Sequence, residues 1–322
     1  MTRFDRKINV DAVERAVDEN APENTWFRDL LKHWRPAGEL QGGGAKSTQS
    51  DEDHLRLAIR DGYLNFYHYG QSVARVKVVK GKLQAEVHNK YVYGDQGGSG
   101  QEYIKITDGT YKNHDGTRGI FRYGIVHDVI LNASGHAGEE KSFVDGVVAR
   151  NAGVIDLEVG LPADPDLWSE NSAQRMDLAA VEPCGDHYRL AFWEAKLASN
   201  PEARCKDAGK APKVIAQLKT YEKWIAKNRK VVSEAYQSCC TDLVRLYEIA
   251  KKLDKGKPGL GKAINAVAGS TLCVDSTPRL IIDATKGDAA FEKNGHLKKL
   301  HDSGICVRMV RTDADMFLSA GA

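Results

Sequence analysis

Two acidic residues and a lysine lie near the ends of two apolar, strand-like segments in the second half of the chain. Asp177 belongs to the first segment, residues 175–183 (RMDLAAVEP), and Glu194 and Lys196 end the second, residues 188–196 (YRLAFWEAK). Side chains two apart in a strand share a face, so Glu194 and Lys196 point the same way. If the segments pair as neighbouring strands, Asp177 reaches the same end of the sheet.

These residue types suit a hard metal ion. Two carboxylates, with the backbone carbonyl of Ala195 as a third oxygen, form a site suited to Mg²⁺ or Mn²⁺. Lys196 would then orient a metal-activated water, help to deprotonate it, or neutralise charge developing at phosphorus. The structural alternative is that all three residues form ordinary ion pairs at a sheet edge. The metal site is favoured because Asp177 needs a partner once it is buried, and because the apolar second segment is typical of a central strand.

The spacing resembles the D…(D/E)xK signature of the PD-(D/E)xK nuclease superfamily. Sixteen residues separate Asp177 from Glu194-Ala195-Lys196, and Met176 stands where the family usually has proline. The expected order from residue 139, helix, three strands, helix and strand, also resembles that core. The resemblance covers about residues 139–311. It implies that Asp177 and Glu194 are metal ligands and that Lys196 is the catalytic lysine.

Further candidates come from the flanking helices. Gln217 and Tyr221 are spaced as QxxxY, which resembles an extra motif of the RecB-like branch, and the i, i+4 spacing puts both on one helical face. The family pattern also implies an acid on the helix before the first strand, for which Glu140 is preferred to Glu139. Each has an alternative: Gln217 in solvent, Tyr221 in the core, or Glu140 stabilising a helix N-terminus. Glu158 is an additional candidate if its strand turns it toward the site.

The elements that must position these residues follow from periodicity. Residues 10–34 give two short amphipathic helical patterns, and residues 54–130 give an antiparallel meander of short strands rich in Val and Tyr. Between them lies a Gly/Ser-rich connector, in which GGGAKST superficially resembles a phosphate loop but lacks the adjacent Gly-Lys pair, so that a linker is preferred.

The second half alternates helices and strands. We expect a helix at 139–151, three strands to residue 196, a helix at 211–228, a second helical run to residue 253, a mobile basic loop at 254–270, a strand at 278–285, a helix at 289–304 and a last strand at 305–312. This order predicts an α/β (α+β) fold with a restriction-endonuclease-like core, in which helices flank a central mixed sheet, preceded by a smaller β-rich domain. The predicted divisions are 1–50 (helices and linker), 51–134 (β-rich accessory domain) and 135–322 (nuclease-like domain).

Positive charge is concentrated in one segment of the chain, although the net charge of the whole chain is small. The 322-residue chain is 42% hydrophobic and carries a formal net charge of +2, so the overall balance does not indicate a nucleic-acid partner. Residues 196–230, however, hold ten Lys/Arg and three acids, a local net charge of +7 beside the candidate metal site. The candidate phosphate contacts are Arg204, Lys206, Lys210, Lys213 and Lys219. The tyrosines and lysines of the meander are a second candidate surface, for single-stranded nucleic acid, although ordinary sheet packing is the preferred explanation for them.

The sequence therefore predicts a Mg²⁺- or Mn²⁺-dependent nuclease. DNA is the expected substrate by family resemblance, and RNA stays open. The alternative is an inactive nucleic-acid-binding or scaffolding protein with the same fold. Defence against phage or DNA repair are hypotheses for its role, with a homo-oligomer or a defence-system protein as candidate partners. The six cysteines form no CxxC pair, the first residues lack an apolar signal core, and no apolar run is long enough for a membrane span, so we expect a cytoplasmic location.

Overall fold

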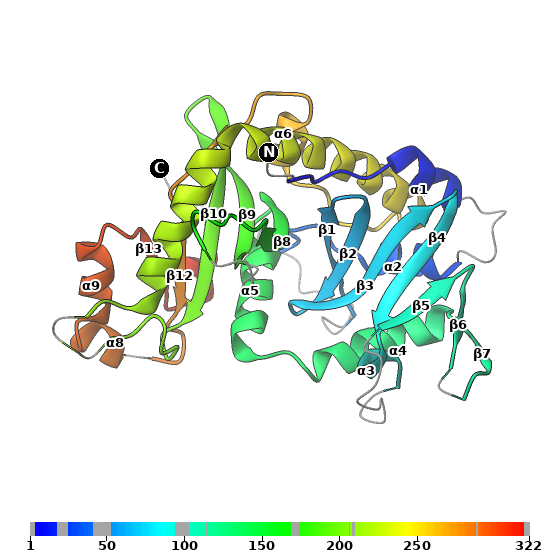
Figure 1. The fold of residues 1–322 in the computed structure, drawn as a ribbon, viewed down its shortest axis with the longest axis horizontal. Helices are drawn as coiled ribbons and strands as arrows, with labels where there is room; N and C mark the ends of the chain where they lie inside the picture. The colour runs from blue at the N-terminus through cyan, green and yellow to red at the C-terminus, as the bar shows by residue number, and fades with distance from the viewer. Residues whose placement is uncertain are drawn as a thin grey trace.

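The computed structural model describes most of the chain. Its described residues are 4–17, 25–40, 53–93, 103–113, 115–168, 174–205, 207, 210–287 and 289–318. They form an N-terminal antiparallel sheet followed by a mixed sheet with helices, which confirms the predicted mixed α/β class (Figure 1). The GGGAKST segment lies outside the described residues.

The first sheet has seven strands that pair in sequence order, from β1 to β7. Their bounds are β1 Arg56–Arg60, β2 Tyr63–His68, β3 Gln71–Val79, β4 Lys82–His88, β5 Tyr103–Thr107, β6 Thr110–Lys112 and β7 Arg118–Ile120. Apolar residues alternate onto one face, where Phe66 of β2 meets the ring of Phe27 from helix α2 (Thr25–His33). Helix α1 (Val10–Ala16) packs at the same end of the molecule as β4 (Figure 1). The opposite face of the sheet is polar and rich in tyrosine.

Two parts of the region predicted as strands are helical. They are α3 (Asn89–Tyr93) and α4 (Tyr123–Ser134). The meander predicted for residues 54–130 is therefore wrong over α3 and over the part of α4 that it included. The residues of α4 that are buried against the first sheet recur at i, i+3, i+4 and i+7, and they are Val126, Val129, Ile130 and Ala133.

The second sheet has β10 (His187–Leu197) at its centre. Its order is β13-β12-β10-β9-β8, and β11 also pairs with β10. The pairs β8/β9 and β9/β10 are antiparallel, whereas β10/β12 and β12/β13 are parallel. The other bounds are β8 Val154–Leu161, β9 Gln174–Cys184, β11 Cys273–Val274, β12 Arg279–Asp283 and β13 Val307–Val310. A central strand buried on both faces explains why residues 190–195 are nearly all apolar.

Helices α5 (Glu139–Arg150) and α6 (Lys213–Leu253) cover opposite faces of this sheet. Trp193 of β10 belongs to the same buried cluster as Val147 of α5, whereas Phe192, one residue earlier, meets the ring of Tyr236 from α6. Successive residues of β10 thus face different helices. Glu194 and Lys196, two and four residues after Phe192, face the α6 side.

Several helix boundaries differ from the prediction. The two helical runs predicted between 211 and 253 are present and are joined as α6, with non-helical backbone at Asn228, where the first run was expected to end; α6 runs from the second sheet to α1 (Figure 1). The expected loop 254–270 contains α7 (Lys262–Val267). The expected helix 289–304 is divided into α8 (Ala289–Lys293) and α9 (His296–Asp302) by Gly295, whose φ of +74° suits glycine. A 3₁₀ helix, η3 (Asp313–Met316), follows β13.

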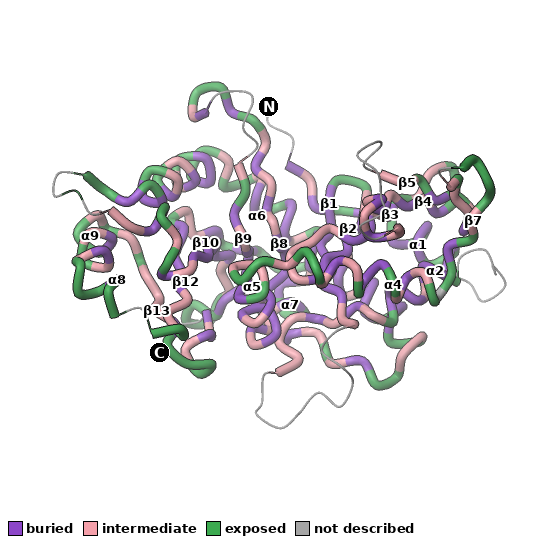
Figure 2. Tube along the Cα trace, turned by 90° about the horizontal axis from the view of Figure 1, so that it is seen from below, coloured by how far each residue is buried: buried purple, intermediate pink, exposed green. Residues whose placement is uncertain are grey.

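Two buried ion networks join the sheets. The carboxylate of Asp156 on β8 accepts from Arg6 Nε and from Tyr236 Oη of α6, each at 2.8 Å, and from Arg60 of β1. In the second network, Arg56 of β1 bonds Asp145 of α5 and also Glu39. Buried residues run continuously through both halves (Figure 2). The first sheet is therefore tied to the second sheet and to α5 by largely buried ion pairs.

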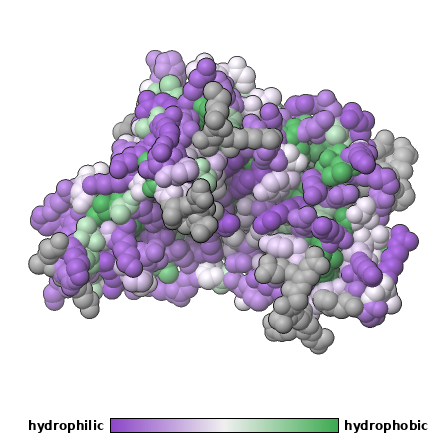
Figure 3. Space-filling view, in the orientation of Figure 1, coloured by the Kyte–Doolittle hydropathy of each residue, from purple (hydrophilic) through white to green (hydrophobic). Residues whose placement is uncertain are grey.

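The described surface is mainly polar. Large hydrophobic side chains that are exposed among the described residues are Ile120 and Leu131. Hydrophilic residues cover most of the face drawn in Figure 3. None of the helices in the described ranges combines the length and apolar character that crossing a membrane requires.

Candidate active site

Asp177 on β9 and Glu194 on β10 lie where the two strands separate. The last antiparallel pair is Trp193 opposite Leu178. Beyond it, Oδ2 of Asp177 accepts a hydrogen bond from the backbone N–H of Ala195 at 2.8 Å, in place of a ladder partner. The N–H and C=O of a strand residue point to the same side, so the Ala195 carbonyl faces the same gap as the Asp177 carboxylate.

Lys196 lies beside Glu194 and is surrounded by acids. Its Nζ is 2.8 Å from Oε1 of Glu194, 3.8 Å from Oε1 of Glu140 and 3.7 Å from Oε2 of Glu202. The side chains of Glu194 and Lys196 are only 3% and 8% exposed. Their charges are thus held largely out of water, where electrostatic interactions are strong.

Helix α6 brings Gln217 and Tyr221 to the same carboxylate. Nε2 of Gln217 donates to Oε1 of Glu194 at 3.2 Å and to the Tyr221 hydroxyl at 2.6 Å. The Tyr221 hydroxyl in turn donates to the backbone carbonyl of Arg175 at 2.6 Å. The two helix residues therefore connect β10 to β9 across the gap, and they hold Glu194 in one orientation.

The first turn of α5 supplies the acid expected from the helix before β8. Oε2 of Glu140 accepts from Asn200 Nδ2 at 2.8 Å, and its Oε1 is the oxygen near Lys196. Glu139, the alternative, is exposed and pairs with Lys286 instead. Of the two acids, the structure places Glu140 in the cluster.

Glu158 also faces the site. Leu157 pairs with Leu178 and Val159 with Met176, so the register places Glu158 opposite Asp177, with a φ of +50° that is unusual for a residue other than glycine. Its carboxylate bonds Lys141 and lies 3.7 Å from Arg175. Lys141 Nζ is also 3.9 Å from Oδ1 of Asp177, and so joins Glu158 to the central pair.

Burial and crowding shift the pKa values of the cluster. Burial raises the pKa of Glu194 to about 8, and neighbouring Asp177 adds to the shift while Lys196 opposes it. Burial likewise raises the pKa of Asp177, against the effect of Lys141. For Lys196, burial acts to lower the pKa, but the surrounding carboxylates, Glu194 first, outweigh it and raise the pKa above its usual value. Burial, and then Glu194, raise the pKa of Tyr221. Lys196 is therefore a charged donor at neutral pH and not a base.

The cluster fits a divalent cation in charge and in donor atoms. The linked carboxylates are Asp177, Glu140, Glu158, Glu194 and Glu202, and the linked cations are Lys141, Arg175 and Lys196. Fully ionised, this set carries a formal excess of two negative charges. Oε2 of Glu194 is buried and has no hydrogen-bond partner among the described residues. Buried polar atoms are normally paired, so an unpaired carboxylate oxygen beside the gap suits a cation.

The donors available to such an ion are few. Within the described ranges, no group of three or more His, Cys, Asp or Glu side chains is arranged to hold a metal. The candidate ligands are two carboxylates, Asp177 and Glu194, and the Ala195 carbonyl. Mg²⁺ is the cation that best matches this set, because it is often bound through one or two carboxylates and keeps several waters.

The basic residues that follow β10 differ in whether they already have partners within the protein. Arg204 donates through Nε to the Ala198 carbonyl, and Lys210 pairs with Asp207 at 2.9 Å. Lys213 and Lys219 are exposed on the first turns of α6. Lys206 lies outside the described residues. Of the candidate phosphate contacts that the structure describes, Lys213 and Lys219 are exposed and have no ion-pair partner among the described residues.

Sequence reasoning missed four neighbours of the site. They are Lys141, Arg175, Asn200 and Glu202. Lys141 follows Glu140 directly, so its position in the same helical turn was a usable signal. Asn200 and Glu202 lie in the loop after β10, and nothing in their local pattern indicates that the loop folds back on Lys196.

Comparison with known proteins gives no relative for this chain. No protein-family model, curated protein or solved structure among those compared with it matches.

Proposed function

We propose that the chain is a Mg²⁺- or Mn²⁺-dependent nuclease that hydrolyses phosphodiester bonds of DNA. The observation that carries this proposal is the meeting of Asp177, Glu194 and Lys196 at one gap between β9 and β10, with a buried oxygen of Glu194 unpaired. An ion pair that served stability alone would not need this unpaired oxygen, because leaving a buried polar atom without a partner costs about 1–3 kcal/mol.

The residues divide into three roles. Asp177, Glu194 and the Ala195 carbonyl would hold the divalent ion, which when bound supplies positive charge to the phosphate and to the attacking water. Lys196 would donate to a phosphoryl oxygen and offset the negative charge that develops as water attacks phosphorus. Gln217 and Tyr221 would act as positioning residues, since their hydrogen bonds orient Glu194.

Membership of the PD-(D/E)xK superfamily is part of the proposal. It is supported by the order α5, β8, β9, β10, α6 and β12, and by the mixed sheet in which the antiparallel strands β8, β9 and β10 continue into parallel β12. The Asp and Glu-Ala-Lys residues stand on the second and third of these strands, as the resemblance implies. The position of Gln217 and Tyr221 beside Glu194 supports the QxxxY branch.

A cleavage assay tests the proposal. Purified protein is incubated with plasmid, linear single-stranded DNA and RNA, with Mg²⁺, Mn²⁺ or EDTA. We expect DNA cleavage that requires the metal, and a loss of about 10²–10³-fold for Asp177→Ala, Glu194→Ala and Lys196→Ala, the size typical for removing one electrostatic group from an active site. Glu139→Ala is the matched control, because it removes an exposed acid that pairs with Lys286 outside the cluster.

The outcomes separate the proposal from its alternative. Full cleavage by all three variants, each shown to be folded, would refute the assigned site. Binding of nucleic acid without cleavage under any metal condition would instead favour the inactive binding protein. Binding should also weaken as salt is raised, because Lys213 and Lys219 would contact the phosphate backbone.

A further inference from the structure

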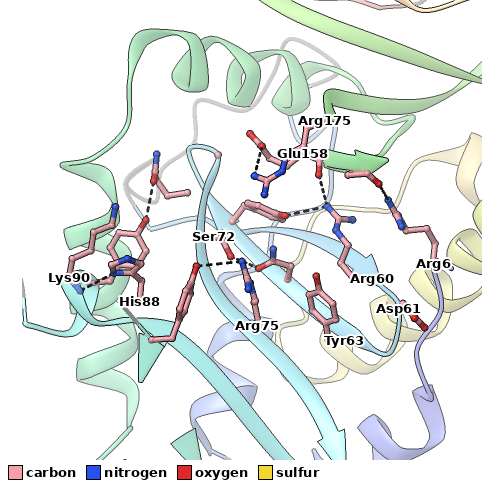
Figure 4. A pocket seen from close by; sticks show the side chains of 17 residues that line it. Arg6, Arg60, Asp61, Tyr63, Ser72, Arg75, His88, Lys90, Glu158 and Arg175 are labelled. Carbon is pink, nitrogen blue, oxygen red and sulfur yellow. Dashed lines mark hydrogen bonds and ion pairs between the residues drawn. The ribbon is translucent and has the colours of Figure 1, made fainter. Parts of the chain in front are cut away.

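A polar cavity adjoins the acidic cluster on the side of the first sheet. It has a volume of about 520 Å³ and lies between the tyrosine-rich face of β2, β3, β4 and β5 and the edge formed by β8 and β9. Tyr63 and Arg75 project into it from the first sheet, and Glu158 and Arg175 come from the opposite wall (Figure 4). Pockets of about 300–1,000 Å³ are the usual size for a ligand as large as a nucleotide.

Two tyrosines of this cavity have exposed surface on which a flat ligand can stack. Tyr63 and Tyr103 are partly exposed, whereas Tyr67 and Tyr91 are 5% and 3% exposed and belong to the floor. The guanidinium carbon of Arg75 lies 5.1 Å from the centre of the Tyr103 ring. Stacking on an aromatic ring is how proteins bind the bases of unpaired strands, because every base has a flat face.

Five cations, Arg6, Arg60, Arg75, Lys90 and Arg175, and two acids, Asp61 and Glu158, line the cavity. Arg6 and Arg60 line it but are paired with buried Asp156. Among the described residues, by contrast, no carboxylate lies within ion-pair distance of Arg75 or Lys90. The Arg75 guanidinium lines the cavity and lies beside the Tyr103 ring. A guanidinium without an ion-pair partner beside an aromatic ring suits a phosphate that follows a stacked base.

The cavity and the acidic cluster share residues. Glu158 and Arg175 line the cavity, and Glu158 is bonded to Lys141, which lies 3.9 Å from Asp177. Arg175 precedes Asp177 by two residues on β9. A strand whose phosphate lies at Asp177 would therefore place a neighbouring nucleotide at the mouth of the cavity. A base that is paired within a duplex is not free to enter it.

We propose that this cavity binds an unpaired nucleotide of the substrate strand, with its base against Tyr63 and Tyr103 and a phosphate on Arg75 and Arg175. This inference rests on the proposed nuclease function, and it narrows the substrate to DNA that offers an unpaired nucleotide next to the cleaved bond. The first sheet is then the substrate-selecting part of the protein.

Equilibrium binding without metal tests this separately from cleavage. The fluorescence anisotropy of a labelled 12-nucleotide single strand is measured with the full chain in EDTA, beside a blunt duplex of the same sequence and a duplex with one bulged nucleotide. We expect the single strand to bind at least about tenfold more tightly than the blunt duplex. If the bulged duplex binds nearly as well as the single strand, a nucleotide displaced from a helix is enough for binding. If it binds as weakly as the blunt duplex, binding requires a free strand. Either result supports recognition of an unpaired nucleotide.

Matched variants locate the binding. Tyr63→Ala should weaken single-strand binding about tenfold, while Tyr63→Phe, which keeps the ring, should bind as the wild type does. Arg75→Gln should weaken it by a similar factor. Lys77→Gln is the control, because Lys77 lies two residues from Arg75 on the same strand but outside the cavity.

The result that overturns the inference is unchanged single-strand binding by both Tyr63→Ala and Arg75→Gln, or equal affinity for the blunt duplex. Circular dichroism and thermal melting establish that each variant is folded, and Tyr63→Phe shows whether the hydroxyl rather than the ring matters. If binding follows the expected pattern but no DNA is cleaved, the cavity assignment stands and the nuclease proposal fails. If DNA is cleaved but these variants bind normally, the nuclease proposal stands and the cavity assignment fails.

Discussion

Replacing Glu194 by Gln should make the stability of the metal-free protein depend less on pH. The pKa of Glu194 is raised to about 8 in the folded chain, from an ordinary value of 4.5. A carboxyl group with a raised pKa binds more protons in the folded than in the unfolded state. The wild type therefore loses stability as pH rises from about 4.5 to about 8, and a glutamine, which does not titrate, removes this loss.

The size of the effect follows from the shift. Between about pH 5 and pH 8 the difference in free energy of unfolding between Glu194→Gln and the wild type should move by roughly 3 kcal/mol in favour of the variant. The interaction of the ionised Glu194 carboxylate with Lys196 is already contained in this pKa, so it is not added to the difference a second time. The comparison across pH isolates the charge.

Urea unfolding in EDTA at several pH values measures this difference. Glu139→Gln, which changes an exposed acid outside the cluster, should differ from the wild type by a constant amount over the same range. If the wild-type and Glu194→Gln curves run parallel from pH 5 to pH 8, the carboxyl group is not held in a low-dielectric, crowded environment, and the argument for a cation-binding gap loses its electrostatic basis.

Two further substitutions test the packing around the site. Tyr221→Phe removes a buried hydroxyl that donates to the backbone carbonyl of Arg175, so it should lower the free energy of unfolding in urea by about 1–3 kcal/mol and also reduce cleavage. Tyr247→Phe on the same helix should cost less, since no hydrogen bond of its hydroxyl is found among the described residues. Gly261→Ala would place a Cβ 1.9 Å from the carbonyl oxygen of Ala152 and should lower stability by about 1–3 kcal/mol, whereas Gly259→Ala, with no atom within 4 Å of the new carbon, should leave the melting temperature nearly unchanged.

The sequence predicted the second sheet well because its signals are local. The apolar run of β10 has no polar face, which indicates a strand buried on both sides, and the spacing of Glu194 and Lys196 within it fixes their common face. The sequence also predicted that Asp177 lies near Glu194 and Lys196, because two strands joined by a short turn pair as neighbours. The bond from Ala195 to Asp177 was not predictable, since it depends on where the two strands separate.

Other features depend on contacts between distant segments. The first part of helix α4 fell within the residues predicted as a meander, although its burial against the first sheet follows helical spacing. The tyrosines of the first sheet were assigned to ordinary packing. All three of Tyr63, Tyr67 and Tyr91 line the cavity, but Tyr67 and Tyr91 are buried, as packing requires, whereas Tyr63 is partly exposed. Nothing in the sequence indicates that this face of the sheet adjoins the acids of β9 and β10.

The hydrogen bonds of the Asp156 carboxylate make the second half of the chain depend on the first half for its stability. The partners of this carboxylate come from the extended N-terminal segment, from β1 and from α6, so a fragment that begins at residue 135 would retain the buried acid and lose both arginines. Breaking a buried ion pair typically costs about 3–5 kcal/mol, a large part of the stability of an ordinary domain. The half that carries the acids is therefore not expected to fold when it is excised. Under the proposed function, the same linkage keeps the distance between the nucleotide cavity and the acids constant, so cuts should fall at a fixed number of nucleotides from the captured base.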